Sequence, residues 1–337
     1  MKELLRKLSE FENLSKEEVI RALRDIVDGS ATDAQIGAFI MGMKMKGETP
    51  EEIEGAATFF RERATKVELK DTESLVDTCG TGGDMAETFN VSTAVAFVLA
   101  GAGIRVAKHG NRSVSSKSGS ADLLEYLGAK IDLGPEQVKT MIEEVGIGFM
   151  FAPIFHPAMK RVIGPRKEVG IRSIFNLIGP LSNPAGAKRQ LLGVFSHAFV
   201  ERVAHALKGM GIIKAFVVHG NDGLDEVSIS APTRIAELRE GKVLLYDFRP
   251  EEVGFKTYPI DYIKVGGVEE SAKTVLSVLK GEVSPAYYMV LINAMFGVLA
   301  SGVTEDRKTA LEIAKDAIHS GKAYEKLQKF IELSKKV

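Results

Sequence analysis

The chain has 337 residues, of which 45% are hydrophobic and 26% are charged, and its formal net charge is −1. These values are ordinary for a globular protein, and a nearly neutral chain has no overall attraction for nucleic acid or for a membrane surface. The one cysteine, Cys79, excludes an intrachain disulfide, and no apolar run reaches the roughly 18 residues of a membrane span. Because the first residues are charged and lack an apolar signal core, we expect a cytoplasmic protein.

The first part of the chain predicts helices without strands. Ser15 and Glu18 have the spacing of a capping box, and Pro50 stands at the first position of a later helix. We therefore expect a small helical domain over residues 1–70. Part of 160–185 is expected to join it, because the chain there is apolar and then rich in turn residues.

From residue 71 onward, apolar strands alternate with helices, which is the pattern of repeated βαβ units. The expected strands are 75–79, 104–108, 147–151, 190–195 and 215–219, followed by short strands with turns over 233–262 and by helices over 271–280, 285–300 and from 305 to the end. The predicted fold is α/β, with a larger domain over 71–337 whose mainly parallel central sheet is flanked by helices. Ligands of such sheets bind beyond the carboxyl ends of the strands.

A glycine loop follows the first expected strand. Gly80, Gly82 and Gly83 break the strand, and an apolar helix restarts at about Asn90. This junction aims backbone N–H groups and the positive end of a helix dipole at one point, which suits a phosphate. Met85 replaces the last glycine of a dinucleotide fingerprint, and the loop lacks the lysine of a Walker loop. A plain turn is the alternative. It is disfavoured by a surplus of polar side chains, those of Asp84, Asn90, Ser92 and Thr93.

A second polar loop, residues 108–122, follows the next strand. It holds three cations, one histidine, one amide and five hydroxyls within 15 residues. Lysine and arginine form charge-assisted hydrogen bonds with phosphate. A solvated surface loop is the alternative, but a ligand with two separate phosphate groups would need two such loops.

An acidic pair, Asp225 and Glu226, follows a third strand end. Adjacent carboxylates suit a hard divalent cation that shares its coordination sphere with substrate phosphates. Two solvated acids in a turn are the alternative; beside two phosphate loops, Mg²⁺ bridging a pyrophosphate is the better interpretation.

These motifs, in this order along the chain, resemble those of the anthranilate phosphoribosyltransferase family. The residues that carry the resemblance are 80–84, 90–93, 108–116, 118–122, 175–184 and 225–226. The resemblance implies an enzyme of tryptophan biosynthesis that joins anthranilate to phosphoribosyl pyrophosphate. It also implies a small helical domain and a larger α/β domain with the active site between them, and a homodimer.

The resemblance also implies roles for individual residues. Phosphoribosyl pyrophosphate would contact Gly80, Gly83, Asp84, Thr88, Asn90, Val91, Ser92, Thr93, Lys108, His109, Gly110, Asn111, Arg112, Ser113, Val114, Ser115, Ser116 and Ser120. Anthranilate would contact Gly80, Asn111 and Arg166, with His156 at the position of an aromatic-pocket histidine. Mg²⁺ would be held by Ser92, Asp225 and Glu226.

The implied reaction needs little acid–base chemistry. The aniline nitrogen attacks the anomeric carbon of the ribose and pyrophosphate leaves, so positioning and charge stabilisation should dominate. Mg²⁺ and Lys108 would stabilise the departing pyrophosphate. No dedicated general base is assigned, and for His109 a structural role is favoured over one as a weak acid or base.

Two other functions are weighed. A pyrimidine nucleoside phosphorylase is similar in fold but would not need the acidic pair, and a non-catalytic relative that binds nucleic acid is disfavoured by the net charge of −1. Type I phosphoribosyltransferases are disfavoured because their hydrophobic strand ending in two acids and a Thr-Gly-Gly-Thr loop is missing.

Overall fold

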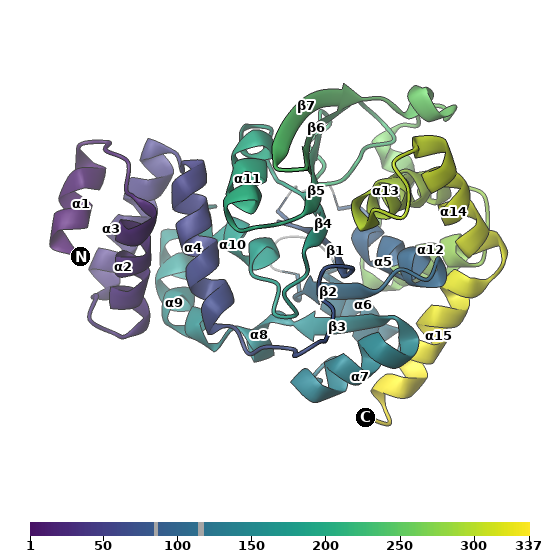
Figure 1. Ribbon diagram of the computed structural model, residues 1–337, viewed down its shortest axis with the longest axis horizontal. Coiled ribbons are helices and arrows are strands. Elements are labelled where there is room, and N and C mark those ends of the chain that lie inside the picture. Colours follow the sequence, from purple (N-terminus) through teal and green to yellow (C-terminus); the bar gives the residue numbers. More distant parts are fainter. Residues whose placement is uncertain (84–86, 114–117) are drawn as a thin grey trace.

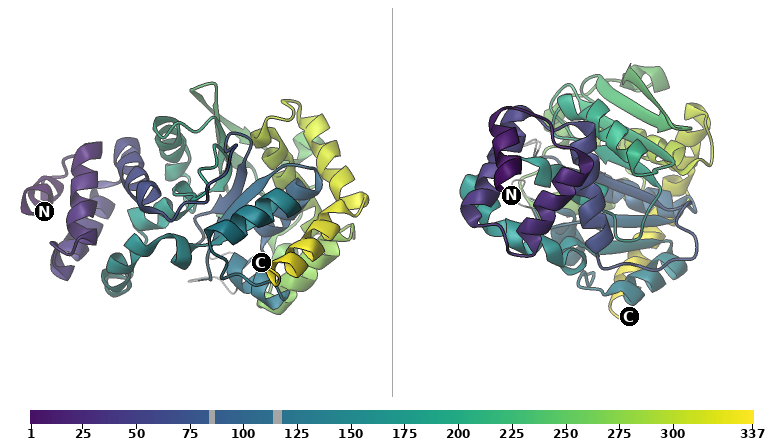
Figure 2. Two further views of the ribbon diagram at one scale, coloured as in Figure 1. Left: turned by 60° about the horizontal axis from the view of Figure 1, so that its bottom comes forward. Right: turned by 60° about the vertical axis from the view of Figure 1, so that its left-hand side comes forward.

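The computed structural model describes residues 1–83, 87–113 and 118–337. The molecule is elongated, with a small helical part at one end and a larger α/β part at the other (Figure 1, Figure 2). This arrangement confirms the expected fold class. Among the described residues, no helix is long and apolar enough to cross a membrane.

The helical part begins with helices whose ends are fixed by local capping. These helices are α1 (Lys2–Ser9), α2 (Lys16–Val27), α3 (Asp33–Lys46) and α4 (Pro50–Arg63). Ser15, Thr32 and Thr49 each accept a hydrogen bond from the backbone N–H three residues later, and the residue there bonds back to the cap. Each capping box satisfies two backbone N–H groups that a helix start would otherwise leave unpaired.

Two later helices pack into the same apolar cluster. They are α9 (Lys160–Val169) and α10 (Ile174–Leu181), and they contribute Val162, Phe175 and Ile178 to the cluster formed by α1 to α4. The rings of Phe60 and Phe175 meet edge to face across α4 and α10, with centroids 6.2 Å apart. This packing supports the proposal that part of 160–185 belongs to the small domain, although the limits of the two domains stay a prediction.

In the described part of the chain, the central sheet has the strand order β3-β2-β1-β4-β5-β6-β7. The parallel strands are β1 (Val76–Gly80), β2 (Val106–Gly110), β3 (Ile147–Phe151), β4 (Arg189–Gly193) and β5 (Lys214–Gly220). The segment that was expected to form short strands is an antiparallel hairpin of β6 (Thr233–Arg239) and β7 (Lys242–Phe248), followed by two 3₁₀ turns, η2 (Pro250–Val253) and η3 (Ile260–Ile263).

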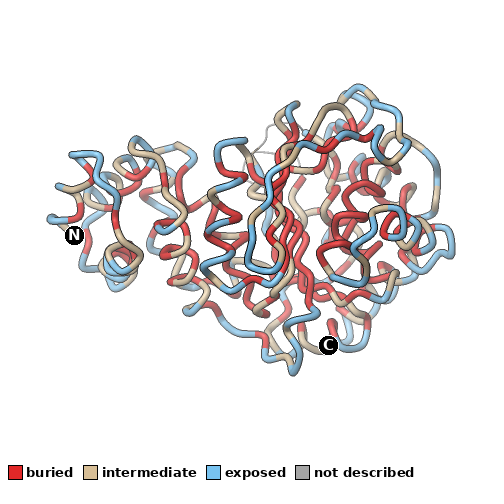
Figure 3. Tube along the Cα trace, turned by 45° about the horizontal axis from the view of Figure 1, so that its top comes forward, coloured by how far each residue is buried: buried red, intermediate tan, exposed pale blue. Residues whose placement is uncertain are grey.

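Helices cover both faces of the sheet, and the strands are the buried centre of the larger part (Figure 3). Side chains alternate between the faces. Leu191 joins the core beneath α5 (Val91–Gly101) and α13 (Pro285–Ser301), whereas its neighbour Leu192 joins the core beneath α4, α10 and α11 (Ala198–Gly209). The remaining helices are α6 (Ser120–Tyr126), α7 (Pro135–Val145), α8 (Ala152–Phe155), α12 (Val268–Leu279), α14 (Arg307–His319) and α15 (Lys322–Ser334). The last segment was expected to be helical from 305, and it is divided into α14 and α15 by Gly321, which has a φ of 77°.

Candidate active site

The carboxyl ends of four parallel strands meet at one edge of the sheet. β1 pairs with both β2 and β4, and β4 pairs with β5, so Gly80 lies directly beside Gly193. The loops that follow β1, β2 and β5 carry the three motifs of the sequence. The structure therefore brings the glycine loop, the cationic loop and the acidic pair to the same rim.

The acidic loop crosses over the ends of β1 and β4 at very short range. The backbone N–H of Gly82 donates a hydrogen bond of 2.7 Å to Oδ2 of Asp225. A Cβ atom added at Gly193 would lie 1.5 Å from the carbonyl oxygen of Asp225, and one at Gly80 would lie 2.4 Å from its Oδ2. Glycine at both positions leaves the space that this loop occupies. The sequence reasoning missed Gly193, because its contact is with a residue far along the chain.

Lys108 is not part of the polar loop, because it is the third residue of strand β2 and is almost fully buried. Its Nζ donates to the carbonyl oxygen of Thr78 and, over 3.3 Å, to Oγ of Ser92 at the start of α5. Burial lowers the pKa of Lys108, and the nearby carboxylates of Asp77 and Glu226 oppose that shift. The amino group of Lys108 thus lies next to Thr78, just before the glycine loop, and beside the hydroxyl of Ser92, which is expected to bind metal.

Asn90 joins the glycine loop to the cationic loop. Its Oδ1 accepts hydrogen bonds from Oγ of Ser118 (2.8 Å) and Oγ of Ser271 (2.7 Å), and its Nδ2 donates to the carbonyl oxygen of Ser118 (3.0 Å). The backbone N–H of Asn90 also donates to Oγ of Ser271. The start of α5 is therefore fixed from two sides, and Ser271 on α12 is a supporting residue that the motifs did not reveal.

Arg112 is held by carboxylates of its own segment. Its guanidinium pairs with Glu125 at 2.7 Å and with Asp122 at 3.1 Å, and these bonds raise the pKa of Arg112. Asp122 also accepts hydrogen bonds from the backbone N–H groups of Ser113 and Gly119, both 2.9 Å. The proposed contact of Arg112 with phosphate would have to compete with these pairs.

Two neutral histidines form an aromatic wall beside the end of β2. The rings of His109 and His156 lie 4.8 Å apart, and Nδ1–H of His109 donates to the carbonyl oxygen of Gly179 on α10 over 3.0 Å. Burial lowers the pKa of His109 to about 3 and that of His156 to about 4. The Nε2 atoms of both rings are buried without a hydrogen-bond partner among the described residues. These rings are suited to contact an aromatic ligand and are poor bases near neutral pH.

Arg166 lies on α9, in the helical part. Its Cζ atom is 5.7 Å from the centroid of the Phe175 ring on α10, and burial lowers its pKa. Helix α10 therefore contacts two predicted parts of the acceptor site. Its Phe175 packs against Arg166, which is expected to bind the carboxylate of anthranilate, and the carbonyl oxygen of its Gly179 accepts the hydrogen bond from His109.

The other predicted residues have varied environments. Val91 and Thr93 are buried in the first turn of α5, and Oγ1 of Thr93 has no hydrogen-bond partner in the described ranges. Thr88 forms an isolated bridge with Lys264, and Asn111 accepts the backbone N–H of Arg112. A Cβ atom at Gly110 would lie 2.2 Å from Oγ of Ser120. Four predicted residues lie outside the described residues: Asp84, Val114, Ser115 and Ser116.

Comparison with known proteins decides the family. Residues 72–324 match the family model described as "Glycosyl transferase family, a/b domain", and residues 2–64 match "Glycosyl transferase family, helical bundle domain". The chain is 60% identical over 337 residues to the anthranilate phosphoribosyltransferase of Aquifex aeolicus, a match that covers 100% of this chain and 99% of that protein. The chain belongs to the anthranilate phosphoribosyltransferase family. The resemblance inferred from the motifs is thereby confirmed.

Solved anthranilate phosphoribosyltransferases share the whole fold. The enzyme from Thermus thermophilus superimposes with a TM-score of 0.92 at 39% identity, over 98% of this chain and 99% of that one. The Saccharomyces cerevisiae enzyme in complex with phosphoribosyl pyrophosphate and Mg gives 0.89 at 28% identity, over 99% and 97% of the two chains. The same yeast enzyme in complex with 4-fluoroanthranilate gives 0.88 at 27% identity, over 99% and 97%.

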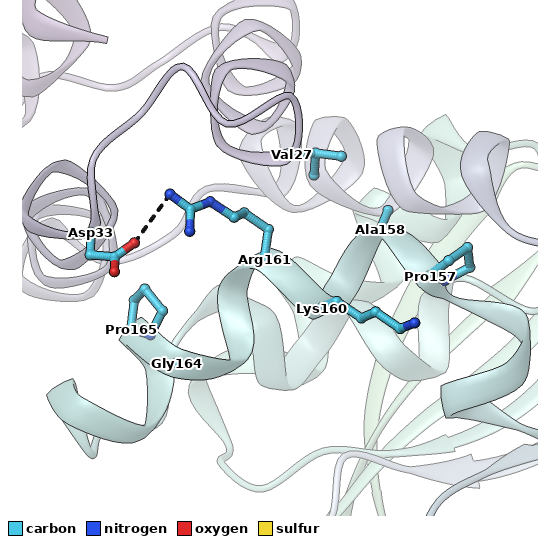
Figure 4. A pocket seen from close by; sticks show the side chains of 8 residues that line it. All are labelled: Val27, Asp33, Pro157, Ala158, Lys160, Arg161, Gly164 and Pro165. Atoms are coloured by element: carbon cyan, nitrogen blue, oxygen red, sulfur yellow. Dashed lines mark ion pairs between the residues drawn. The ribbon is translucent and has the colours of Figure 1, made fainter.

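A hollow of about 480 Å³ lies in the helical part of this anthranilate phosphoribosyltransferase family member, and its lining includes none of the predicted site residues (Figure 4). Its side chains come from α2, from the start of α3 and from the segment around α9, and Arg161 forms a 3.3 Å ion pair with Asp33 across it. The strand ends are the better candidate for the active site, because the charged side chains and the glycine loop that could bind phosphate and metal lie there and not around the hollow.

Proposed function

We propose that this chain transfers the phosphoribosyl group of phosphoribosyl pyrophosphate to the amine of anthranilate, releasing pyrophosphate, as a step of tryptophan biosynthesis. The observation that carries the proposal is the convergence at the end of β1. There the glycine loop accommodates Asp225, with 2.7 Å between Gly82 N and Oδ2, and the buried Lys108 reaches Ser92. A donor with two separate phosphate-bearing groups needs a cradle, a cation and a metal site within reach of one another, and we assign these roles to the glycine loop, Lys108 and the acidic pair.

Phosphoribosyl pyrophosphate would lie along the rim formed by the ends of β1 and β2. Backbone N–H groups of the glycine loop and the N-terminus of α5 would bind one phosphate group, and the loop after β2 would bind the other. Burial lowers the pKa of Lys108 and the carboxylates of Asp77 and Glu226 oppose that shift; in its protonated form Lys108 would stabilise charge that develops on the leaving pyrophosphate. Removal of one such donor costs about 3 kcal/mol, or roughly a hundredfold in rate.

The donor set at the rim fits Mg²⁺. Asp225, Glu226 and Ser92 offer oxygen ligands, and within the described ranges no group of three or more histidine, cysteine, aspartate or glutamate side chains is placed to hold a metal by itself. Mg²⁺ is commonly held by one or two carboxylates together with substrate phosphates, so a site completed by the substrate is the expected arrangement. Bound Mg²⁺ would supply charge neutralisation at the pyrophosphate.

Anthranilate would approach from the side of the helical domain. The rings of His109 and His156 would contact its ring, Arg166 would bind its carboxylate, and Asn111 and Gly80 would border its amine. Because the pKa values of the two histidines are about 3 and about 4, neither ring is expected to accept a proton from the amine. The proposed catalysis therefore depends on orientation and charge rather than on a general base.

The remaining proposals concern the assembly. We expect a cytoplasmic homodimer whose small domain comprises residues 1–70 and part of 160–185. Exposed apolar side chains on the helical part, including Met41 and Met45 of α3, are compatible with a subunit interface there. The molar mass in solution, measured by light scattering, would distinguish a dimer from the 36.5 kDa monomer.

A direct assay tests the reaction. Protein, Mg²⁺, phosphoribosyl pyrophosphate and anthranilate are mixed, and the loss of anthranilate fluorescence is followed. The proposal expects loss that requires all components. Phosphorolysis of thymidine or uridine without consumption of anthranilate would instead support a nucleoside phosphorylase, and retention of single-stranded DNA or RNA at low salt would support a nucleic-acid-binding relative.

A further inference from the structure

The loop that carries Asp225 and Glu226 is fixed on both sides of the pair. Before the pair, Asp222 accepts hydrogen bonds from Oγ of Ser228 (2.5 Å) and from the backbone N–H of Leu224 (3.4 Å). Oγ of Ser228 in turn accepts the backbone N–H groups of the next turn, at Ser230 and Ala231. These bonds stabilise the loop internally but do not fix its position relative to the sheet.

Two side chains from outside the loop fix its position. Oγ1 of Thr233, the first residue of β6, accepts the backbone N–H of Ser228 over 2.8 Å, and the other side chain is that of Asn293. Asn293, in the middle of α13, is completely buried. Its Oδ1 accepts the backbone N–H of Val227, and its Nδ2 donates to the carbonyl oxygen of the same residue, both at 2.9 Å. A further bond from Nδ2 to the carbonyl oxygen of Met289, also 2.9 Å, fixes the amide plane. Asn293 therefore pairs with both polar backbone groups of Val227, as a neighbouring strand would.

The sequence of α13 makes this arrangement unusual. The stretch from Met289 to Ala300 is apolar apart from Asn293, and it packs against the sheet. A buried amide in such a helix is costly unless it is hydrogen-bonded. Here, two of its three bonds go to the residue that directly follows Glu226, which links the amide to the acidic pair rather than to general packing.

We propose that Asn293 is a positioning residue for metal binding, which holds Val227 so that Asp225 and Glu226 present their carboxylates at the strand ends. The inference rests on the proposed function, because it assigns to the pair the role of holding Mg²⁺ with phosphoribosyl pyrophosphate. Partners that orient ligating carboxylates commonly change metal affinity by 10- to 100-fold when they are lost. Without Asn293, Val227 would lose its attachment to α13, and the carboxylates of the pair would be held less firmly above Gly80 and Gly193.

The test compares two variants with a matched control. Asn293→Leu keeps the branched shape and the number of heavy atoms and removes both bonds to Val227, and Asn293→Ala removes them with a smaller side chain. Met295→Ala, on the same helix and equally buried, removes apolar contacts but neither of the hydrogen bonds between Asn293 and Val227. Binding of Mn²⁺, used as a paramagnetic probe for Mg²⁺, is measured by electron paramagnetic resonance in the presence of phosphoribosyl pyrophosphate, and KM for anthranilate is measured in parallel.

We expect both Asn293 variants to bind Mn²⁺ about tenfold more weakly or worse, with KM for anthranilate changed less than twofold. Met295→Ala should leave Mn²⁺ binding unchanged even if it lowers the melting temperature. Unchanged Mn²⁺ affinity in the Asn293 variant that folds, or equal weakening by Met295→Ala, would overturn the positioning role. If the wild-type protein itself binds no Mn²⁺ in the presence of this substrate, the proposed metal-binding role of the acidic pair is wrong, and the inference about Asn293, which rests on it, is wrong as well.

Discussion

A single methyl group at residue 80 should displace the carboxylate of Asp225 without unfolding the protein. In Gly80→Ala the new Cβ would lie 2.4 Å from Oδ2 of Asp225 and 3.1 Å from its Cγ. Gly80 does not have a positive φ, so alanine adds no backbone strain there. The atoms in the way are at the end of a side chain, which can rotate, and that rotation would break the 2.7 Å hydrogen bond from the backbone N–H of Gly82.

The magnitude follows from that bond. A hydrogen bond to a charged group contributes about 1.5–3 kcal/mol. If about 2 kcal/mol of this is lost from the transition state, kcat/KM falls roughly 30-fold. The free energy of unfolding should change by less than about 1 kcal/mol, because only a side-chain end moves. Gly193→Ala should behave differently, since its Cβ would lie 1.5 Å from a backbone oxygen and the loop itself would have to shift.

The assay is anthranilate consumption under Mg²⁺ saturation, with urea unfolding measured on the same samples. The methyl group could also touch a substrate directly, so a double-mutant cycle with Asp225→Ala separates the two causes. If the effect passes through Asp225, Gly80→Ala should cost little in the Asp225→Ala background. An equal loss of rate in both backgrounds would refute the reasoning. Gly164→Ala serves as a control, because its Cβ would meet nothing within 4 Å.

Three other perturbations have defined outcomes. His156 has a pKa of about 4 in the folded protein against an ordinary 6.5, so the unfolded chain binds a proton that the folded chain does not, and stability is lost as the pH falls below 6.5. His156→Phe should therefore remove about 2 kcal/mol of the loss in unfolding free energy between about pH 7 and pH 5. Equal slopes of unfolding free energy against pH in the wild type and in His156→Phe would contradict this. Arg166→Ala should raise KM for anthranilate far more than KM for phosphoribosyl pyrophosphate, and parallel increases would remove Arg166 from the acceptor site. Glu52 is fully buried and accepts hydrogen bonds from Lys46 and from two backbone N–H groups. Glu52→Gln should therefore lower the free energy of unfolding by about 3–5 kcal/mol, whereas Glu51→Gln, at an exposed position, should lower it by less than about 0.5 kcal/mol. Similar urea midpoints for the two variants would contradict the assignment of a buried ion pair.

Local signals were sufficient to predict most of the fold. The capping box at Ser15 was predicted because it depends on residues three positions apart, and the structure has two more of the same kind at Thr32 and Thr49. The five parallel strands were expected within about two residues of their observed bounds because each is a short apolar run between turn residues. The lateral order of the strands was not predicted, because it depends on contacts between distant segments. The antiparallel hairpin of β6 and β7 was not predicted either, although its two-residue turn, Glu240 and Gly241, is a local feature of the chain.

The same limit applies to the site. Glycine and charge patterns indicated the three loops, and the structure brings them together. Those patterns could not show that Lys108 is buried within β2, that Arg112 is paired with Glu125, or that Gly193 leaves room for Asp225. Asn293 is noticeable in the sequence as a single amide in a long apolar helix. Its role could not be predicted from that pattern, because it depends on the hydrogen bonds with Val227 that only the structure shows.

The claim on which the account depends is that the strand ends hold phosphoribosyl pyrophosphate together with Mg²⁺ through the acidic pair. Calorimetric titration of this substrate into the wild-type protein and into Asp225→Asn/Glu226→Gln, each with and without Mg²⁺, tests it most directly. We expect Mg²⁺ to tighten binding to the wild-type protein by about tenfold or more and to have little effect on the variant. The same Mg²⁺ effect in both proteins, or no binding to either, would contradict the account.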